Sequence, residues 1–499
     1  MNEIHALQLG KVNWNEIYTL PADLILDYVE TYTEAPEKPY DLVLWDRLPL
    51  EEELEALYQS TKAYTLFVTK DVLLNPHAKW LYESRKGQLL AKDDIQRFLL
   101  EETRFYFPKP YGEKYNPNNL TVSRNFSGSV QWDGQYALEL QGEFGEDMQQ
   151  IAYWRNNIPL FPHQVIDFWL EYKKTPGVEI SLVITRMPNG SLSDIIARHE
   201  FTERELKHTV HIEAGATDER IFVSISAKGA GELKIIALHD RYSRGTHGHF
   251  LPGGERYVTT DREEIFCYFE PMDRKPPLNV FFSGYKTAEG FEGYGLMHSM
   301  GCPFLLIGEP RLEGGSFYMG SGEYEQLLTD VLNRYISELG FSADEVILSG
   351  ISMGTYGAMY YGCGVRPHAL LLGKPLASIG DVAANEQRFR PGGFPTSLDV
   401  LHYICGDTNA AAVQKLNDKF WNRFDVVDWS KTKFVVSYMI EDDYDATAYQ
   451  KLLSHIQSEG VQVYGRGYHG RHNDNTGGIV SWFSSQFKKL LREDFDRNI

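Results

Sequence analysis

The stretch Val346-Ile347-Leu348-Ser349-Gly350-Ile351-Ser352-Met353-Gly354-Thr355 decides the fold of the carboxyl-terminal half of the chain. An apolar run typical of a buried strand passes directly into Gly-x-Ser-x-Gly and then into a helical pattern. A strand that turns sharply into a helix at this pattern is a nucleophile elbow. The glycines let strand and helix approach closely, and the turn raises the serine hydroxyl above the sheet edge. Because the pattern is short, its meaning depends on the residues that follow it.

The chain around the elbow alternates between strand and helix patterns. Apolar runs predict buried strands at 278–282, 304–307, 346–348, 369–372, 433–440 and 461–464. Apolar residues of helical period predict an amphipathic helix from Tyr324 to Leu339 that ends at Gly340, and a final helix from Ile479 to Leu491. This alternation predicts a mostly parallel sheet with helices on both faces, whose active site lies at the carboxyl ends of the strands.

An acid and a histidine follow the serine in the order that such a site needs. The turn after the 433–440 strand carries Glu441, Asp442 and Asp443, and we favour Asp442 as the orienting carboxylate with the other two as alternatives. The loop before the final helix carries His469 and His472, and we favour His472 as the general base. The order serine, acid, histidine is that of α/β hydrolases, so residues 257–499 are predicted to form an α/β-hydrolase-like catalytic domain.

The oxyanion hole of this site is predicted from two backbone N–H groups. One belongs to Met353, directly after the nucleophile Ser352, and the other to Gly284 or Tyr285, after the 278–282 strand. Two such donors supply about 3–4 kcal/mol each to the lowering of the barrier.

The amino-terminal half predicts two further domains. Residues 1–112 predict a small α/β domain, because apolar runs at 41–45 and 64–68 flank an acidic amphipathic helix, the pattern of a parallel βαβ unit. No phosphate loop accompanies it, so we expect this domain to bind a partner. Residues 118–250 predict an antiparallel β-sandwich of short alternating strands.

Aromatic and histidine residues of the sandwich region suggest two kinds of ligand. Exposed aromatics would make the sandwich a carbohydrate-binding domain, with Trp132, Tyr153, Trp154 and Trp169 as candidates, although the commoner role of such residues is core packing. His239, His247 and His249 could suggest a metal, but no closely spaced acid or cysteine completes a site, which favours histidines in surface loops. We therefore expect no bound metal and no bound cofactor.

Composition excludes several classes of protein. The formal net charge of −20 and the lack of a block rich in lysine and arginine argue against nucleic acid as a partner. The start of the chain has no basic region followed by an apolar run, and no uncharged apolar stretch is long enough to span a membrane. The four cysteines lack zinc or CxxC spacing. We expect a cytoplasmic location, and a peripheral position at the membrane translocase is compatible with it.

The elbow within Leu-Ser-Gly-Ile-Ser-Met-Gly-Thr-Tyr-Gly, the acidic turn Tyr-Met-Ile-Glu-Asp-Asp-Tyr-Asp and the closing Gly-Arg-His-Asn-Asp loop carry a resemblance to a known family. The chain resembles the second of the three accessory secretory proteins of the accessory Sec system of Gram-positive cocci. The resemblance implies a role in export of serine-rich-repeat adhesins and O-acetylation of their N-acetylglucosamine residues by a Ser-Asp/Glu-His triad. It also implies, as partners, two sibling accessory proteins, the motor ATPase of the system and the adhesin glycoprotein.

The resemblance assigns Ser352 as nucleophile, His472 as base and the Glu441–Asp443 cluster as acid. Nothing in the sequence names the acetyl donor. Two alternatives stay open: a carbohydrate esterase, which needs the same triad, and a non-catalytic export factor that uses the hydrolase fold as a scaffold.

Overall fold

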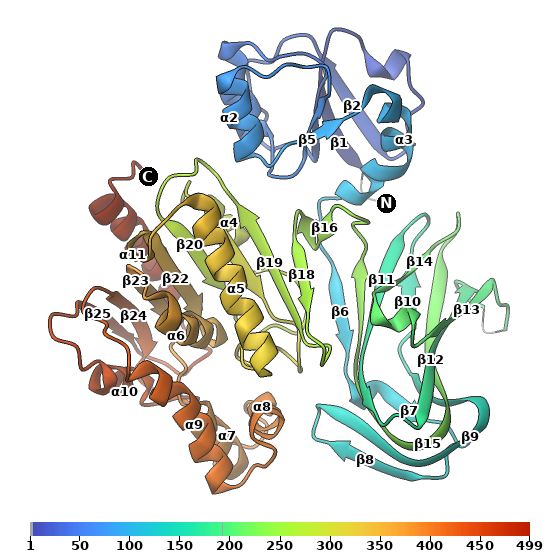
Figure 1. Ribbon diagram of the computed structural model, residues 1–499, viewed down its shortest axis with the longest axis vertical. Helices are drawn as coiled ribbons and strands as arrows, with labels where there is room; N and C mark the ends of the chain where they lie inside the picture. The colour runs from blue at the N-terminus through green and yellow to red at the C-terminus, as the bar shows by residue number, and fades with distance from the viewer. Residues whose placement is uncertain (1–2, 192) are drawn as a thin grey trace.

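The structure, a computed structural model, describes residues 3–191 and 193–499. Three large sheets of five, ten and eight strands follow one another along the chain, and a two-stranded ribbon of β16 (Gly248–His249) and β17 (Leu251–Pro252) lies between the second and third. Figure 1 shows the sheets as three parts of the molecule, of which the first and third carry most of the helices. Among the described residues, no helix combines the length and hydrophobicity that crossing a bilayer requires.

The first sheet is fully parallel and has the order β2-β1-β3-β4-β5. Its strands are β1 (Ile4–Leu9), β2 (Leu24–Val29), β3 (Leu42–Trp45), β4 (Leu66–Thr69) and β5 (Gln88–Leu90). The parallel pairing of β3 with β4 confirms the predicted βαβ unit, whereas the sequence patterns do not indicate β1, β2 or β5. Helices α1 (Leu54–Ser60) and α2 (Pro76–Ser84) cover one face and α3 (Ile95–Arg97) the other, so the central strands β1, β3 and β4 are buried on both sides, whereas the edge strands β2 and β5 have exposed positions.

The crevice at the carboxyl ends of β1 and β3 is filled by the chain itself. The chain leaves β1 toward β2 and leaves β3 toward β4, on opposite sides. In an open parallel sheet, ligands usually bind between two such strands. Here Trp14 is 2% exposed, and its indole N–H lies 3.4 Å from the Asp46 carboxylate. The Gln8 side chain accepts a hydrogen bond from the Trp14 backbone N–H at 3.0 Å and donates one to the Val12 carbonyl at 2.8 Å. The loop after β1 therefore closes over the strand ends.

The second sheet is one continuous antiparallel sheet folded over itself. Its longest strands, β9 (Ala137–Trp154) and β15 (Glu219–Tyr242), pair with each other and run through both layers. The first half of β15 also pairs with β12 (Val178–Pro188) and the second half with β11 (Val165–Lys174), and apolar side chains fill the space between the layers. The sequence predicts separate short strands here, but the two layers share these two long strands. The remaining strands are β6 (Gly112–Tyr115), β7 (Leu120–Val122), β8 (Ser129–Asp133), β10 (Ile158–Leu160), β13 (Ala197–Thr202) and β14 (Val210–Glu213).

The candidate carbohydrate-binding aromatics divide into two pairs. Trp154 and Trp169 are each 2% exposed and belong to the interior, Trp169 beneath the guanidinium groups of Arg256 and Arg262. Trp132 is 43% exposed and Tyr153 is 38% exposed. Carbohydrate binding stays a prediction for this exposed pair only.

The third sheet has the order β18-β19-β21-β20-β22-β23-β24-β25. Only β19 runs against the direction of the other seven strands, so the prediction of a mostly parallel sheet is confirmed. The bounds are β18 (Glu255–Val258), β19 (Glu264–Glu270), β20 (Leu278–Phe282), β21 (Phe304–Gly308), β22 (Val346–Ile351), β23 (Ala369–Gly373), β24 (Lys433–Met439) and β25 (Val463–Tyr468). Each of the six predicted strands overlaps a strand of this sheet, but the last, predicted at 461–464, begins at Val463 and runs on to Tyr468. The strands β18 and β19 precede them and are not predicted.

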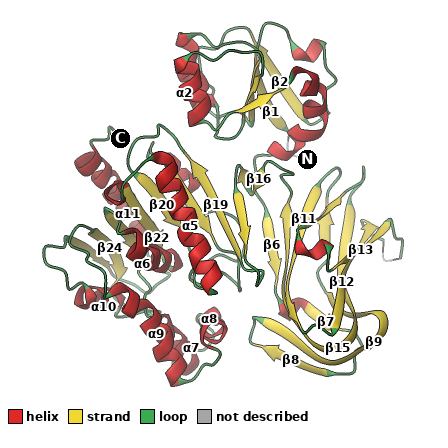
Figure 2. Cartoon of the chain, in the orientation of Figure 1, coloured by secondary structure: helices red, strands yellow, loops and turns green. Residues whose placement is uncertain are grey.

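Helices cover both faces of the third sheet (Figure 2). Helices α5 (Gly322–Leu339) and α6 (Met353–Val365) pack on one face, and α4 (Tyr294–His298) and α11 (Thr476–Phe495) on the other. The end of α5 at Gly340, which has φ +73°, confirms the predicted C-terminal glycine. Four further helices follow β23 and β24: α7 (Ile379–Arg388), α8 (Thr396–Cys405), α9 (Ala410–Phe424) and α10 (Ala448–His455).

Helix α8 joins the third part to the second. The hairpin between β8 and β9 lies against it, with the Gln135 N–H donating to Asp399 at 3.2 Å and the Asp133 carboxylate 2.8 Å from His402. The rings of Tyr136 and Tyr403 lie 5.4 Å apart. Helix α8 is therefore anchored on the folded second sheet.

Replacing Gly229 with alanine should destabilise the fold at the bend of β15. Gly229 has φ +94°, and an added Cβ would lie 2.1 Å from the Gly177 carbonyl oxygen. We expect a loss of about 2–4 kcal/mol in the free energy of unfolding, because steric overlap adds to a backbone strain of about 1–3 kcal/mol. Urea unfolding followed by intrinsic fluorescence measures it. Gly190→Ala is the matched control, since φ is +85° there but nothing lies within 4 Å of the added Cβ. Equal losses in both variants would contradict the steric argument.

Candidate active site

The elbow is built by close contact between β22 and α6. Ser352, between them, has φ +56° and ψ −122°. A Cβ on Gly350 would lie 2.3 Å from the Gly354 carbonyl carbon, and one on Gly354 would lie 2.1 Å from the Phe282 carbonyl oxygen. Both glycines of the motif are therefore required by the packing of the helix on the sheet.

Ser352, His472 and Asp442, here called the triad, form a continuous chain of hydrogen bonds. The Ser352 hydroxyl lies 2.8 Å from Nε2 of His472, and Nδ1 of the same ring lies 2.8 Å from Oδ2 of Asp442. His472 is 2% exposed and Asp442 is 7% exposed. With Nδ1 donating to the carboxylate, Nε2 is left as the acceptor that a serine proton requires.

Asp442 is held as a carboxylate. Burial alone would raise the pKa of Asp442, but the hydrogen bond and charge of His472 and the backbone N–H groups of Tyr444 and Asp445 outweigh it, so this pKa lies below its usual range. Those two N–H groups lie 2.8 and 3.2 Å from the second carboxylate oxygen, Oδ1. An ionised Asp442 stabilises the imidazolium that forms when His472 accepts a proton.

The neighbouring acids and the second histidine have other partners. Glu441 pairs with the exposed His469 at 2.9 Å. Asp443 accepts the His472 backbone N–H at 3.0 Å and pairs with Arg390 at 3.1 Å. The contacts thus match the favoured choices, Asp442 and His472, whose catalytic roles stay a prediction. Asp443, one of the alternatives, instead helps to hold the histidine loop.

The candidate oxyanion donors differ in their availability. The Gly284 N–H donates to the Glu292 carboxylate at 2.7 Å and is already engaged. Within residues 3–191 and 193–499, the N–H groups of Met353 and Tyr285 donate no hydrogen bond to another residue. The pair left to meet a developing oxyanion is therefore Met353 and Tyr285.

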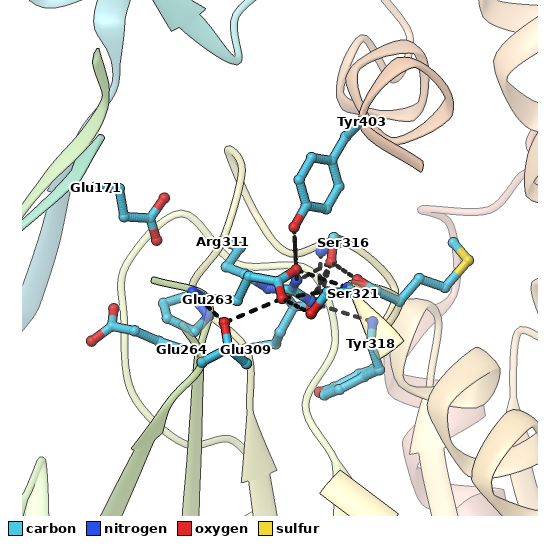
Figure 3. Close-up of polar contacts among 12 residues, drawn as sticks. Glu171, Glu263, Glu264, Glu309, Arg311, Ser316, Tyr318, Ser321 and Tyr403 are labelled. Carbon is cyan, nitrogen blue, oxygen red and sulfur yellow. Dashed lines mark hydrogen bonds and ion pairs between the residues drawn. The ribbon is translucent and has the colours of Figure 1, made fainter. Parts of the chain in front are cut away.

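A buried polar network supports the oxyanion side of the site (Figure 3). Glu309 accepts the backbone N–H groups of Ser316 and Tyr318 at 2.8 and 2.9 Å, and the Tyr318 hydroxyl donates to the Ser283 carbonyl at 2.7 Å. Arg311 donates to Glu309 at 2.8 Å. The residue before Gly284 is thus fixed from the loop after β21. The sequence signal that indicates this network is weak: two charged residues directly after a buried strand.

The same network extends to α8. Arg311 donates to Glu263 at 2.8 Å, and the Tyr403 hydroxyl also bonds to Glu263. Figure 3 shows Tyr403 pointing from its helix toward this cluster. Glu263 therefore connects the network that holds Ser283 to helix α8.

One buried cluster among the described residues has the composition of a metal site. Side-chain ligand atoms of Glu171, His239 and Glu264 all lie within 4.8 Å of one another. Two arginines, Arg241 and Arg256, already pair with Glu264. Burial would lower the pKa of His239, but adjacent carboxylates, Glu289 foremost, raise it to about 9. Three carboxylates then balance two guanidinium groups and an imidazolium, which favours an ion-pair network over a metal site.

The prediction of surface-loop histidines is wrong for His239. This residue lies within β15 and is fully buried between the second and third sheets. It is flanked by Glu171 at 3.3 Å and by Glu289. The partners come from distant parts of the chain, so local spacing does not indicate them.

Sheet order, elbow and triad together define an α/β protein with a site of the serine-hydrolase type. The chain belongs to the family described as "Accessory Sec system GspB-transporter", whose model matches residues 4–497. Two relatives, both named as accessory Sec system proteins, come from Streptococcus gordonii, 36% identical over 508 residues, and from Staphylococcus aureus (strain NCTC 8325 / PS 47), 43% identical over 510 residues. Alignments cover 99% of this chain in both cases, and 99% and 98% of the relatives.

Among solved structures, the chain is similar over its whole length to a chain of the "Glycosylation Associate Protein (Gap123) complex from Streptococcus agalactiae". The TM-score is 0.89 and the identity 35%, with 99% of both chains covered. Membership of the accessory Sec family, expected from the motifs, is therefore confirmed.

Asp442→Asn should abolish most of the reactivity of Ser352, whereas Glu441→Gln should preserve it. An asparagine at 442 favours the wrong imidazole tautomer, which lowers the rate of serine attack by about 10³–10⁴-fold in such triads. We expect a loss of this size in the rate at which a fluorophosphonate probe labels Ser352. Among the residues that the structure describes, the Glu441 carboxylate bonds to the His469 ring and the Gly470 N–H at the surface, so its variant should stay within about twofold. A larger loss in Glu441→Gln than in Asp442→Asn would move the acid to Glu441.

Proposed function

We propose that this protein is a component of the accessory Sec export system that O-acetylates N-acetylglucosamine on serine-rich-repeat adhesins. The observation that carries the catalytic part is the unbroken Ser352–His472–Asp442 chain with 2.8 Å contacts. The export part is supported by family membership over residues 4–497. The sugar substrate rests on the family resemblance, because a triad by itself fits many acyl acceptors.

The mechanism is a two-step acyl transfer. The Ser352 oxygen attacks the acetyl carbonyl carbon of the donor while its proton passes to Nε2 of His472. The N–H groups of Met353 and Tyr285 stabilise the oxyanion, and the donor's leaving group departs with the proton from His472. A sugar hydroxyl then gives its proton to the same nitrogen as its oxygen attacks the acetyl-serine, and Ser352 recovers a proton as the O-acetyl sugar leaves.

Assembly with sibling proteins is part of the proposal. The S. agalactiae structure to which the chain is similar is a complex, Gap123, which supports two sibling accessory proteins as partners. The motor ATPase and the adhesin complete the expected set, and we place the protein in the cytoplasm, at the translocase. The exposed Trp132 and Tyr153 are candidates for glycan contact within such an assembly.

A carbohydrate esterase is the second candidate function. It uses the same triad, and only the nucleophile of the second step differs, water in place of the sugar hydroxyl. Purified protein given an acetyl donor and an N-acetylglucosamine-bearing peptide separates the two. Acetyl-sugar as the main product supports transfer, and free acetate as the main product supports an esterase.

Ser352→Ala should abolish acetylation of the adhesin and leave its export intact. Removing the nucleophile lowers the rate of such reactions by about 10⁴-fold or more. Acetyl content of the adhesin glycan by mass spectrometry and the amount of adhesin at the cell surface are the two measurements. Ser454→Ala, at an exposed serine of the same domain, is the control. Wild-type acetylation in Ser352→Ala would remove this serine as nucleophile, and loss of export along with acetylation would show that export depends on catalysis.

A further inference from the structure

Lys374 is a buried lysine at the carboxyl end of β23, beside the triad. It is 3% exposed and has φ +54°, a backbone conformation that residues with side chains rarely adopt. The mechanism above uses no lysine, and lysines are seldom buried without a specific partner. Its position therefore requires an explanation from its contacts.

The backbone around Lys374 links the strands that deliver the nucleophile and the acid. The carbonyl of the preceding Gly373 accepts the Ser352 N–H at 2.7 Å. The Lys374 N–H donates to the Ser437 carbonyl of β24 at 2.7 Å, and β24 leads into the turn that carries Asp442. Lys374 thus lies at the junction of the elbow and the acid turn.

The side chain of Lys374 reaches the third element of the triad. Its ammonium group donates to the Asp474 carbonyl and to the Thr476 hydroxyl, both at 3.0 Å. These acceptors belong to the loop between β25 and α11 that carries His472, and to the first residue of α11. Lys374 therefore follows directly on the residue that bonds to Ser352, and itself bonds to the strand before the acid turn and to the histidine loop.

The Lys374 ammonium group is also close to carboxylates of the site. Burial lowers the pKa of Lys374, while the nearby carboxylates of Asp442 and Asp474 oppose that shift. The cation therefore lies beside the acid of the triad as well as beside the histidine loop.

We propose that Lys374 is a positioning residue of the triad: its ammonium group fixes the loop that carries His472, so that the imidazole stays in line with Ser352 and Asp442. This role deepens the proposed function and rests on it for the reaction itself. It does not depend on the identity of the sugar or of the acetyl donor.

The proposal is tested by the rate of Ser352 labelling with a fluorophosphonate probe in the full chain. We expect Lys374→Met to lower the labelling rate about tenfold or more, because the histidine loop and α11 lose both bonds to the ammonium group and a small displacement of catalytic groups is costly. Lys374→Arg, which keeps a cationic donor at this place, should recover most of the rate. A labelling rate in Lys374→Met equal to that of the unchanged chain would overturn the proposal.

Two further variants keep the test decisive. Lys433→Met is the matched control, since Lys433 is a partly buried, ion-paired lysine at the opposite end of the same sheet, and it should leave the labelling rate unchanged. If Lys374→Met fails to fold, Thr476→Val removes one of the two anchors and retains the lysine. It should then slow labelling, and an unchanged rate would contradict the anchoring role. Labelling needs no sugar, so failure of the acetyltransferase proposal appears separately, in the Ser352→Ala acetylation experiment.

Discussion

The site depends on one backbone constraint, the strained turn at Ser352. A residue with a side chain at φ +56° and ψ −122° costs about 1–3 kcal/mol, which neighbouring contacts must offset. The Ser352 N–H is bonded to Gly373 on the adjacent strand, and its carbonyl accepts the Thr355 hydroxyl at 2.6 Å. Both backbone groups are therefore satisfied although neither belongs to a regular element. The sheet stabilises the turn, and the turn places the hydroxyl against His472.

Buried ion pairs fix the second and third sheets relative to each other. Arg241 bonds to Glu264 with both terminal nitrogens and to Glu289 through Nε, in a cluster closed to solvent. Removing one member of such a cluster costs about 3–5 kcal/mol, because its partner is left as an uncompensated buried charge. Arg241 comes from the second sheet and Glu264 from the third, so the cluster ties the folded sheet to the sheet that carries Ser352. A second network, around Arg311, holds the segment of Tyr318 and Met319 in place. Through the bond of the Tyr318 hydroxyl to the Ser283 carbonyl, it also holds the segment that carries Gly284 and Tyr285.

The sequence predicts those features that depend on local pattern, and it cannot predict those that depend on distant partners. A buried strand, a sharp glycine turn and a helical stripe are local patterns, and the structure has the elbow, α5 and five of the six predicted strands of the third sheet where the patterns place them, whereas β25 lies a few residues further on. In the first sheet, the two predicted strands β3 and β4 are buried at every position. The missed edge strands β2 and β5 have exposed positions, so neither gives a continuous apolar run. In the sequence, His239 cannot be distinguished from the two histidines that follow it, because its partners Glu171 and Glu289 are distant along the chain. Likewise, the sequence does not show that the Glu292 carboxylate accepts the Gly284 N–H.

The difference between transfer to a sugar and transfer to water cannot reside in the triad, because both reactions use the same three residues in the same order. It must reside in the surfaces that border the oxyanion pair and the histidine. Two of these surfaces are loops held by separate networks: the 309–321 loop by Glu309 and Arg311, and the segment before α8 by the contact of Arg390 with Asp443. The second of them runs into α8, which rests on the hairpin between β8 and β9 through the contact of His402 with Asp133. The folded second sheet therefore bears, through α8, on the segment that packs against the acid turn, and this contact is where a ligand of that sheet would act on the site.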